Sequence, residues 1–171
     1  MQKYKIANTT SKDLPNIYSL FEQAIAFQKS NNYPVWNGYD KEVLQKDIKA
    51  KLQYKIIQEN EISCIFTTYY TDPIIWGEQT PKEAIYLHRV VTNPNHRGLK
   101  QFEKVMTWTK NHAQKKNLQS IRMDTWAENP KIIQYYLSFG FQFLGNYLPP
   151  GTNQLPIPYR NLNLALLELP L

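Results

Sequence analysis

Hydrophobic residues recur at two different spacings along this chain, and each change of spacing marks the boundary of an expected element. In the first part of the chain they return every three or four residues, which predicts an amphipathic helix ending at about Ser30. A second helix is expected after Asp40, whose carboxylate can cap the first turn. The apolar faces of these helices consist of Leu14, Ile17, Phe21, Ala24 and Ile25, then Val43, Leu44, Ile48 and Leu52.

Strands are predicted where β-branched and aromatic residues gather. Residues 54–58 and 62–70 are separated by a short polar turn, which predicts a hairpin. Residues 84–92 (AIYLHRVVT) give the clearest strand of the chain. Further strands are expected at residues 4–7, 120–124, 141–148 and 162–169, and loops at residues 71–81 and 149–160.

A long helix is expected after Gly98 and another after Asn129. The second begins with an asparagine that can cap it and a proline that suits a first turn. Residues 84–92, the long helix and residues 120–124 form a βαβ unit, so the two strands should be parallel neighbours. The element order therefore predicts an α/β protein with a mixed sheet and helices on its faces.

The composition is that of an ordinary globular protein, with 42% hydrophobic and 20% charged residues among 171. No internal repeat or shift in composition divides the chain, so a single domain over residues 1–171 is expected. Residues 1–10 do not resemble a signal peptide, and no apolar run approaches the roughly 18–20 residues that span a bilayer. Cys64 is the only cysteine and lies in an apolar strand, which indicates core packing. These features predict a cytoplasmic protein without a membrane partner.

Charge narrows the choice of partners only slightly. The formal net charge is +6, so the surface attracts polyanions such as nucleic acids or the phosphates of CoA. The lysines are spread along the chain, and a solvated basic surface explains them equally well. The sequence lacks the clustered basic stripe and the aromatic strand motif typical of nucleic-acid-binding modules. A nucleic-acid partner is therefore disfavoured.

The segment VVTNPNHRGLKQ, residues 90–101, joins the clearest strand to the long helix. At such a joint several backbone N–H groups point out of the helix N-terminus, where the helix dipole is positive. Arg97 and Lys100 add positive charge beside it. The joint is therefore a candidate binding site for a pyrophosphate, although many such joints bind no ligand.

Several short motifs of this chain occur in the order typical of one superfamily. Residues 94–98 (PNHRG) match the start of a loop with a proline followed by Arg-Gly-x-Gly-x-Gly. Asn129 matches an asparagine that opens the next helix, and residues 136–141 match the Tyr-x-x-x-Gly-Phe ending of that helix. Residues 121–126 match the strand between the two helices. Over about residues 84–145 the chain thereby resembles the Gcn5-related N-acetyltransferase (GNAT) superfamily.

The phosphate loop departs from the family pattern at its two later glycines, which are Lys100 and Phe102 here. In the family these glycines let the backbone approach the pyrophosphate closely. Lys100 still offers its N–H and an ammonium group. Phe102 lies on the apolar face of the helix, so its side chain should turn toward the sheet. These two side chains are the main argument against tight CoA binding.

The resemblance implies a mostly antiparallel sheet of about seven strands with a central parallel βαβ splay. It implies an N-acetyltransferase that uses acetyl-CoA, with pantetheine between the strands beginning at Ala84 and Ser120. A primary amine would attack the acetyl carbonyl directly in a ternary complex, and a backbone N–H near Val90 would stabilise the oxyanion. The tyrosine of the second helix would protonate the departing thiolate, unless it is only a core residue. The implied cofactor contacts are Val90, Val91, Arg97, Gly98, Leu99, Lys100, Gln101, Asn129 and Tyr136.

The sequence offers several candidates for the general base. His88 lies two residues before Val90 on the same strand, so both side chains should point to one face of the sheet. An imidazole titrates near neutral pH, which suits a base, but a hydrogen-bonded structural histidine is an equally good interpretation. Glu78, Glu83, Asp124 and a water relay to bulk solvent stay open as alternatives.

Recognition of the acceptor is expected from aromatic residues. Trp36, Trp76 and Tyr159 are the candidates, and the acceptor would be a small-molecule or peptide amine. His96 and His112 show no metal-ligand spacing, so no metal cofactor is expected. Two further possibilities stay open: a homodimer, and a CoA-binding or sensing domain with little catalysis.

Overall fold

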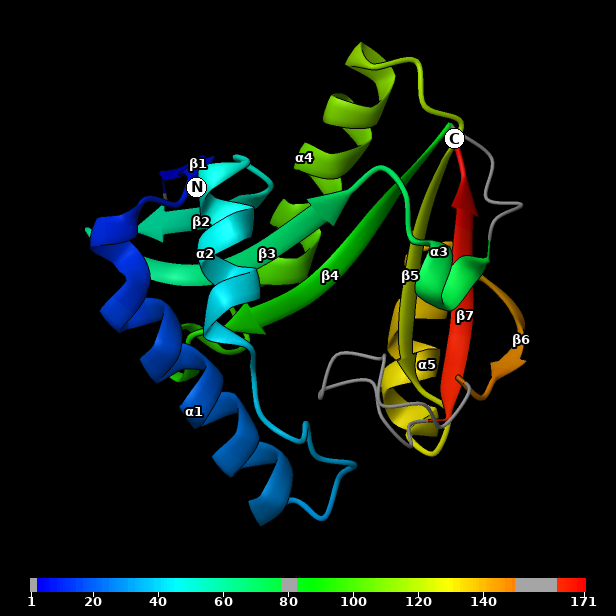
Figure 1. Ribbon diagram of the computed structural model, residues 1–171, viewed down its shortest axis with the longest axis horizontal. Helices are drawn as coiled ribbons and strands as arrows, with labels where there is room; N and C mark the ends of the chain where they lie inside the picture. Colours follow the sequence, from blue (N-terminus) through cyan, green and yellow to red (C-terminus); the bar gives the residue numbers. More distant parts are fainter. Residues whose placement is uncertain (1–2, 78–82, 150–162) are drawn as a thin grey trace.

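Seven strands pair into one sheet within residues 3–77, 83–149 and 163–171, the part of the chain that the computed structural model describes (Figure 1). In chain order they are β1 (Tyr4–Asn8), β2 (Gln53–Gln58), β3 (Glu61–Tyr69), β4 (Ala84–Thr92), β5 (Ser120–Trp126), β6 (Gln142–Tyr147) and β7 (Leu164–Pro170). Their order in the sheet is β1-β2-β3-β4-β5-β7-β6. All neighbours are antiparallel except β4 and β5, so the predicted mixed sheet is confirmed.

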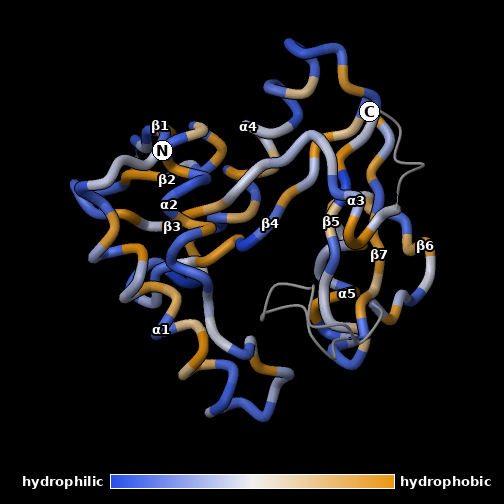
Figure 2. The backbone as a smooth tube through the Cα atoms, viewed as in Figure 1, coloured by the Kyte–Doolittle hydropathy of each residue, from blue (hydrophilic) through white to orange (hydrophobic). Residues whose placement is uncertain are grey.

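Helices cover both faces of this sheet. They are α1 (Leu14–Ser30), α2 (Lys41–Lys49), α3 (Pro73–Trp76), α4 (Gln101–Lys115) and α5 (Pro130–Leu137). α1 and α2 pack with Ile65 and Val91 on one face, whereas α4 and α5 pack on the other (Figure 1). Figure 2 shows hydrophobic residues returning at intervals along α1 and α4 with hydrophilic ones between them, as expected for helices that bury one face.

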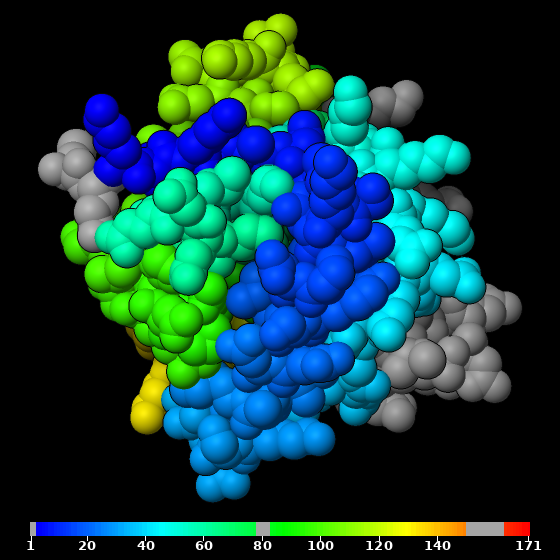
Figure 3. Space-filling view, turned by 90° about the vertical axis from the view of Figure 1, so that its left-hand side faces the viewer, coloured from blue at the N-terminus to red at the C-terminus, as the bar shows by residue number. Residues whose placement is uncertain are grey.

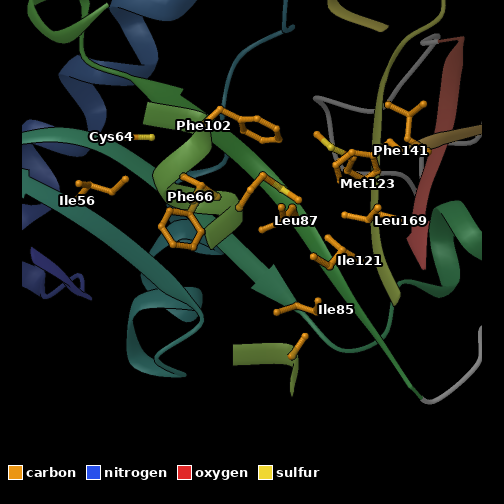
Figure 4. Close-up of a cluster of buried hydrophobic side chains, with 14 residues drawn as sticks. Ile56, Cys64, Phe66, Ile85, Leu87, Phe102, Ile121, Met123, Phe141 and Leu169 are labelled. Carbon is orange, nitrogen blue, oxygen red and sulfur yellow. The ribbon is translucent and has the colours of Figure 1, made fainter. Parts of the chain in front are cut away.

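The larger core lies between the sheet and α4. Phe66, Leu87 and Met123, from three neighbouring strands, belong to one cluster of buried side chains with Phe102 of α4 (Figure 4). Cys64 is fully buried in the same cluster, and burial raises the pKa of its thiol to about 12. The prediction that this cysteine packs in the core is therefore confirmed.

Side-chain caps fix where two of the helices begin. The Asp40 carboxylate accepts hydrogen bonds from the N–H groups of Glu42 and Val43, at 2.9 and 3.2 Å. The side-chain oxygen of Asn129 accepts one from the N–H of Ile132 at 3.2 Å. Both predicted caps are confirmed, and each satisfies a backbone donor that the helix itself leaves unpaired.

The short helix α3 corrects the prediction of a continuous loop over residues 71–81. Asp72 caps it by accepting a hydrogen bond from the N–H of Ile75 at 3.4 Å, and Pro73 occupies its first turn. A single turn of helix is too short to produce a hydrophobic period, so the sequence pattern could not reveal it.

β4 and β5 pair along only part of their length. Their register runs from Ala84 opposite Ser120 to Leu87 opposite Met123, although β4 continues to Thr92 and β5 to Trp126. Beyond this point β4 stays paired with β3, and β5 with β7. The two strands therefore diverge, as Figure 1 shows, and the predicted splay is confirmed.

A β-bulge interrupts β4 at the point where the splay opens. Val91 faces Ile65 and His88 faces Thr67, so two residues of β4 lie opposite one residue of β3. The bulge residue Arg89 has a positive φ of 49°. The extra residue shifts the alternation of side chains by one position.

This shift overturns the prediction that His88 and Val90 share a face of the sheet. Val90 packs against the core on the α4 side, whereas Val91 packs with α1 and α2. His88 lies on the α1 side, where its ring centroid is 5.1 Å from that of Tyr69. A regular strand would have kept residues 88 and 90 together, and the bulge separates them.

Arg89 ties the bulge to helix α2. Its guanidinium donates hydrogen bonds to the Asp47 carboxylate and to the Tyr69 hydroxyl, and that hydroxyl also donates to Asp47 at 2.9 Å. Asp47 is only 5% exposed. Burial raises the pKa of Asp47, and the charge of Arg89 and the hydrogen bond from Tyr69 act against that rise. The ion pair thus compensates a buried carboxylate and holds the bulge in place.

Paired substitutions at Arg89 should reveal the strain of its backbone. Arg89→Gly and Arg89→Ala both remove the guanidinium, so they differ mainly in the presence of a Cβ at a positive φ. We expect the glycine variant to be more stable than the alanine variant by about 1 kcal/mol. Urea unfolding followed by tryptophan fluorescence measures the difference. Equal stabilities, or a more stable alanine variant, would show that the bulge does not hold this φ in solution.

Candidate active site

A cavity of about 820 Å³ opens between α1, the diverging strands β4 and β5, and the start of α4. Most of the residues predicted for the site line it: Trp36, His88, Val90, Val91, Arg97, Gly98, Lys100, Gln101, Asn129 and Tyr136. Leu99 does not line the cavity and is 41% exposed. Trp76 does not line it either, and Tyr159 lies outside the described residues.

One end of the cavity is formed by the N-terminus of α4. The residue that precedes this helix, Lys100, has φ 55° and ψ 40° and does not cap the helix with its side chain. The first N–H groups of a helix lack acceptors within the helix, so an uncapped N-terminus offers them to an anion. Lys100 adopts the left-handed conformation that glycine prefers. The backbone therefore keeps a glycine-like course although the family glycine is replaced.

Phe102, the second departure from the glycine pattern, is only 6% exposed and turns toward the sheet as expected. Its ring lies 5.0 Å from the ring of Tyr136 and 4.9 Å from that of Phe139, between centroids. Gln101 is also buried, and its side chain bonds Ser63 and Gln58. Because its side chain is already bonded, Gln101 can offer an anion only its backbone N–H.

Positive side chains flank this helix end. The Arg97 guanidinium stacks on the ring of Phe27, 3.6 Å from its centroid. Figure 3 shows the green segment that joins β4 to α4 lying beside the blue helix α1, which carries Phe27. Lys100 is largely exposed and pairs with Glu103 at 3.2 Å. The α4 end of the cavity therefore combines helix N–H groups with a fixed guanidinium.

The other end of the cavity is the apex of the splay. His88 and Asp124 directly follow the last paired residues of β4 and β5, so they are neighbours on the α1 face of the sheet. Asp72 approaches from the turn before α3. The Nε2 atom of His88 lies 3.1 Å from Oδ2 of Asp72, and its Nδ1 atom lies 3.8 Å from Oδ1 of Asp124. The imidazole is thus flanked by two carboxylates.

Burial dominates the electrostatics at this apex. The side chains of Asp72 and Asp124 are each 9% exposed. Burial raises the pKa of Asp124 to about 6; the nearby His88 lowers it and Asp72 raises it. Among the described residues, Oδ1 of Asp124 has no hydrogen-bond partner. The apex therefore has an excess of buried negative charge, and it can accept a proton or a cation.

The structure separates the candidates for the base. His88 and Asp124, both named from the sequence, belong to the apex, whereas Glu83 is exposed and does not line the cavity. Glu78 lies outside the described residues. Asp72 was missed, because its only sequence signal is that of an aspartate before a proline at the start of a helix. Asp72 follows β3, and it approaches His88 because β3 pairs with β4 in the sheet.

Tyr136 lines the cavity from α5. Burial raises the pKa of its phenol above the usual value of 10.0, and the neighbouring Tyr135 and Asp124 act in the same direction. The hydroxyl is therefore fully protonated at neutral pH and can donate a proton or a hydrogen bond. Asn129, expected to contact the cofactor, also lines the cavity, and its side-chain oxygen caps α5.

Aromatic side chains form the wall of the cavity beside the apex. Trp36 lies between Phe21 and Trp126, with ring centroids 5.7 and 5.9 Å away. All three line the cavity. Trp76 instead packs on the Arg122 guanidinium, whose central carbon is 4.6 Å from the ring centroid. Among the two described candidates for the acceptor side, only Trp36 faces the cavity.

The sheet of this protein is splayed, and its opening leads from a helix N-terminus to a buried cluster of titratable groups. This is the arrangement expected of a GNAT acetyltransferase. The sequence pattern of the Acetyltransferase (GNAT) family matches residues 24–141, and the chain belongs to this family. A curated relative, the uncharacterized N-acetyltransferase YesJ of Bacillus subtilis (strain 168), is 27% identical over 74 residues. That alignment covers 43% of this chain and 41% of YesJ, less than half of either protein.

Solved structures share the fold over nearly the whole chain. An acetyltransferase of the GNAT family from Listeria monocytogenes matches 98% of this chain and 95% of its own, with a TM-score of 0.78 and 18% identity. The ribosomal-protein-S18-alanine N-acetyltransferase from Escherichia coli matches 98% of this chain and 94% of its own, with a TM-score of 0.68 and 15% identity.

Among the described residues, no helix has both the length and the apolar character needed to cross a membrane.

Asp124→Asn should change how stability depends on pH. The folded-state pKa of about 6 exceeds the ordinary aspartate pKa of 3.8, so between these pH values the folded protein binds more protons than the unfolded chain. The wild-type protein therefore loses stability as pH rises through this window, and asparagine has no charge to bury. We expect the variant to be more stable by about 1–3 kcal/mol near pH 7.5, with the gain fading toward pH 4.

Urea unfolding at a series of pH values measures this difference, and the low-pH values serve as the internal control. A difference that stays constant with pH, or a variant that is less stable near neutral pH, would contradict the assignment of a buried carboxylate without a full partner.

Proposed function

We propose that this protein transfers the acetyl group of acetyl-CoA to a primary amine by direct attack in a ternary complex. The observation that carries the proposal is that a single cavity joins the uncapped N-terminus of α4 to the cluster of His88, Asp72 and Asp124. The helix N-terminus suits the binding of a pyrophosphate, and the cluster suits the removal of a proton from an amine. The family gives the reaction class, and the acetyl donor and the amine are the parts proposed here.

The α4 end would bind the phosphates of CoA. The N–H groups of the first turn of α4, which no side chain caps, and the N–H of Gly98, whose φ is 74°, would donate to the pyrophosphate. Arg97 adds a guanidinium that can bond a phosphate in a bidentate manner. Pantetheine would lie between β4 and β5, where the backbone groups facing the splay are not used for pairing of the two strands.

The chemistry would then take place at the apex. The amine nitrogen forms a bond to the acetyl carbon, while the backbone N–H near Val90 and Val91 donates to the oxyanion; such a donor is worth about 3–4 kcal/mol. His88 accepts the proton that the amine loses, and Asp72 and Asp124 orient the imidazole and stabilise its charge. When the carbon–sulfur bond breaks, Tyr136 donates its proton to the CoA thiolate.

The acceptor is a small-molecule or peptide amine in this proposal. The ribosomal-protein-S18-alanine N-acetyltransferase from Escherichia coli, which shares the fold, is named for an alanine of a ribosomal protein. It illustrates the case of a peptide acceptor. The free and fully buried Cys64 suits a reducing compartment such as the cytoplasm. A homodimer stays a possible assembly.

Tyr136→Phe tests both halves of the proposal. Acetyl-CoA should raise the Tm of the wild-type protein and of the variant equally, because the ring and its packing are retained. The release of free thiol in the presence of an amine should fall about 100-fold in the variant, because the proton donor is lost. Thermal unfolding with acetyl-CoA and a colorimetric thiol assay over a panel of primary amines measure the two effects.

Tyr4→Phe is the control, because it removes an exposed phenolic hydroxyl on β1 that does not line the cavity, and it should leave the rate unchanged. A wild-type protein that shows no Tm shift at millimolar acetyl-CoA would overturn the proposal. Binding of acetyl-CoA without turnover on any amine would favour a CoA-sensing domain instead.

Arg97→Gln tests the phosphate end of the cavity. The loss of a charged hydrogen-bond donor should weaken the binding of CoA about tenfold, because bonds to charged groups contribute about 1.5–3 kcal/mol. Isothermal titration with CoA measures the dissociation constant. Lys110→Gln, an exposed charge change on α4 away from the cavity, should leave the constant unchanged. Equal effects of both variants would indicate a general effect of surface charge rather than a phosphate contact.

A further inference from the structure

The charged residues of the cavity are divided between its two ends. Arg97, Lys100 and Glu103 lie at the α4 end, where Glu103 pairs with Lys100 at 3.2 Å and Arg97 is left as the net positive side chain. Asp72 and Asp124 lie at the apex, and Asp40 lines the cavity at the start of α2. Arg89 also lines the cavity, but its guanidinium bonds Asp47. The cavity is therefore positive where a phosphate would bind and negative where the second substrate would react.

The carboxylates at the apex carry more negative charge than the nearby imidazole can balance, so the apex can bind one cation. Among the described residues, the ion pairs of Asp72 and Asp124 are both with His88. A single imidazole can offset at most one of two carboxylates, and both side chains are nine-tenths buried. Oδ1 of Asp124 lacks a hydrogen bond within the described chain. An incoming ammonium would supply the missing donor and the missing charge.

The aromatic wall starts close to this cation site. Trp126 lies two residues beyond Asp124 on the same strand, so the two side chains share a face and stand about 7 Å apart. Trp36 stacks near Trp126 and extends the wall toward Phe21. An amine whose nitrogen lies at Asp124 would therefore place an apolar body of a few carbon atoms against the two indole rings.

The described residues of this half of the cavity disfavour a carboxylate on the acceptor. A carboxylate beside the amino group would lie against Asp72 and Asp124, which repel it. The described surface thus disfavours amino acids as acceptors.

We propose that the acceptor is a small amine with an aromatic or apolar body and no carboxylate beside its amino group, bound through its ammonium group at Asp72 and Asp124. This inference rests on the proposed acetyl transfer and specifies its acceptor. The ammonium would lose its proton to His88 at the same place where it is bound, so that recognition and activation use one cluster.

Matched amines test the proposal on the full chain. We expect kcat/KM for 2-phenylethylamine to exceed that for phenylalanine by about 100-fold, because the two differ only in the carboxylate. 2-Phenylethylamine should also exceed ethylamine and 1,4-diaminobutane, because both lack the ring. Equal rates for 2-phenylethylamine and phenylalanine, or a preference for the diamine or for a peptide with an N-terminal alanine, would overturn it.

Variants of the apex and of the wall locate the effect. Asp72→Asn should raise KM for 2-phenylethylamine about tenfold and narrow its advantage over phenylalanine, because one repelling charge is removed. Asparagine caps a helix as well as aspartate does, so α3 should be retained. Trp126→Leu should reduce the preference for 2-phenylethylamine over ethylamine and leave the discrimination against phenylalanine intact. Unchanged preferences in either variant would contradict the proposed site.

Two further measurements separate this inference from the function on which it rests. Acetyl-CoA should raise the Tm of both variants as much as it raises the Tm of the wild-type protein. If the wild-type protein itself shows no Tm shift, the proposed acetyl transfer is wrong, and the choice of acceptor is not what failed. The donor atoms of Asp72, His88 and Asp124 lie within 4.8 Å of one another, a spacing that would also suit a metal ion. Activity should therefore survive EDTA, and activity that requires added Zn²⁺ would show that the cluster binds a metal instead of an ammonium.

Discussion

The divergence of β4 from β5 is the constraint on which the rest of the molecule depends. The two strands exchange backbone hydrogen bonds only as far as Leu87 and Met123, and each then keeps its other neighbour. The sheet therefore stays intact on both sides of the opening, and the backbone along the splay is available to a ligand. The cavity, the nearby N-terminus of α4 and the cluster at the apex all follow from this opening.

The bulge in β4 assigns separate tasks to the two faces of the sheet. Without the extra residue, His88 and Val90 would point the same way, and one of them would leave its present surroundings. With it, His88 lies beside Asp72 and Asp124 on the α1 face, while Val90 packs on the α4 side. The ion pair of Arg89 with Asp47 couples this local distortion to α2, so the helix that covers the acceptor side also supports the central strand.

The two ends of the cavity differ in charge. The N-terminus of α4 favours an anion, and the buried carboxylates of Asp72 and Asp124 favour a cation. The chain belongs to the GNAT family, and under the proposed function an anionic cofactor and a cationic acceptor would each bind at one end of this cavity.

Local signals in the sequence determined most of the elements and indicated the N-terminus of α4 as a candidate anion site. Helical spacing, the caps at Asp40 and Asn129 and the strand AIYLHRVVT could be interpreted without a structure, because each depends on residues close in sequence. The bulge at Arg89, the glycine-like backbone of Lys100 and the approach of Asp72 to His88 could not. They arise from pairing between strands and from the packing of distant segments. Only the tertiary structure brings these residues together, and it therefore decided which candidates line the cavity.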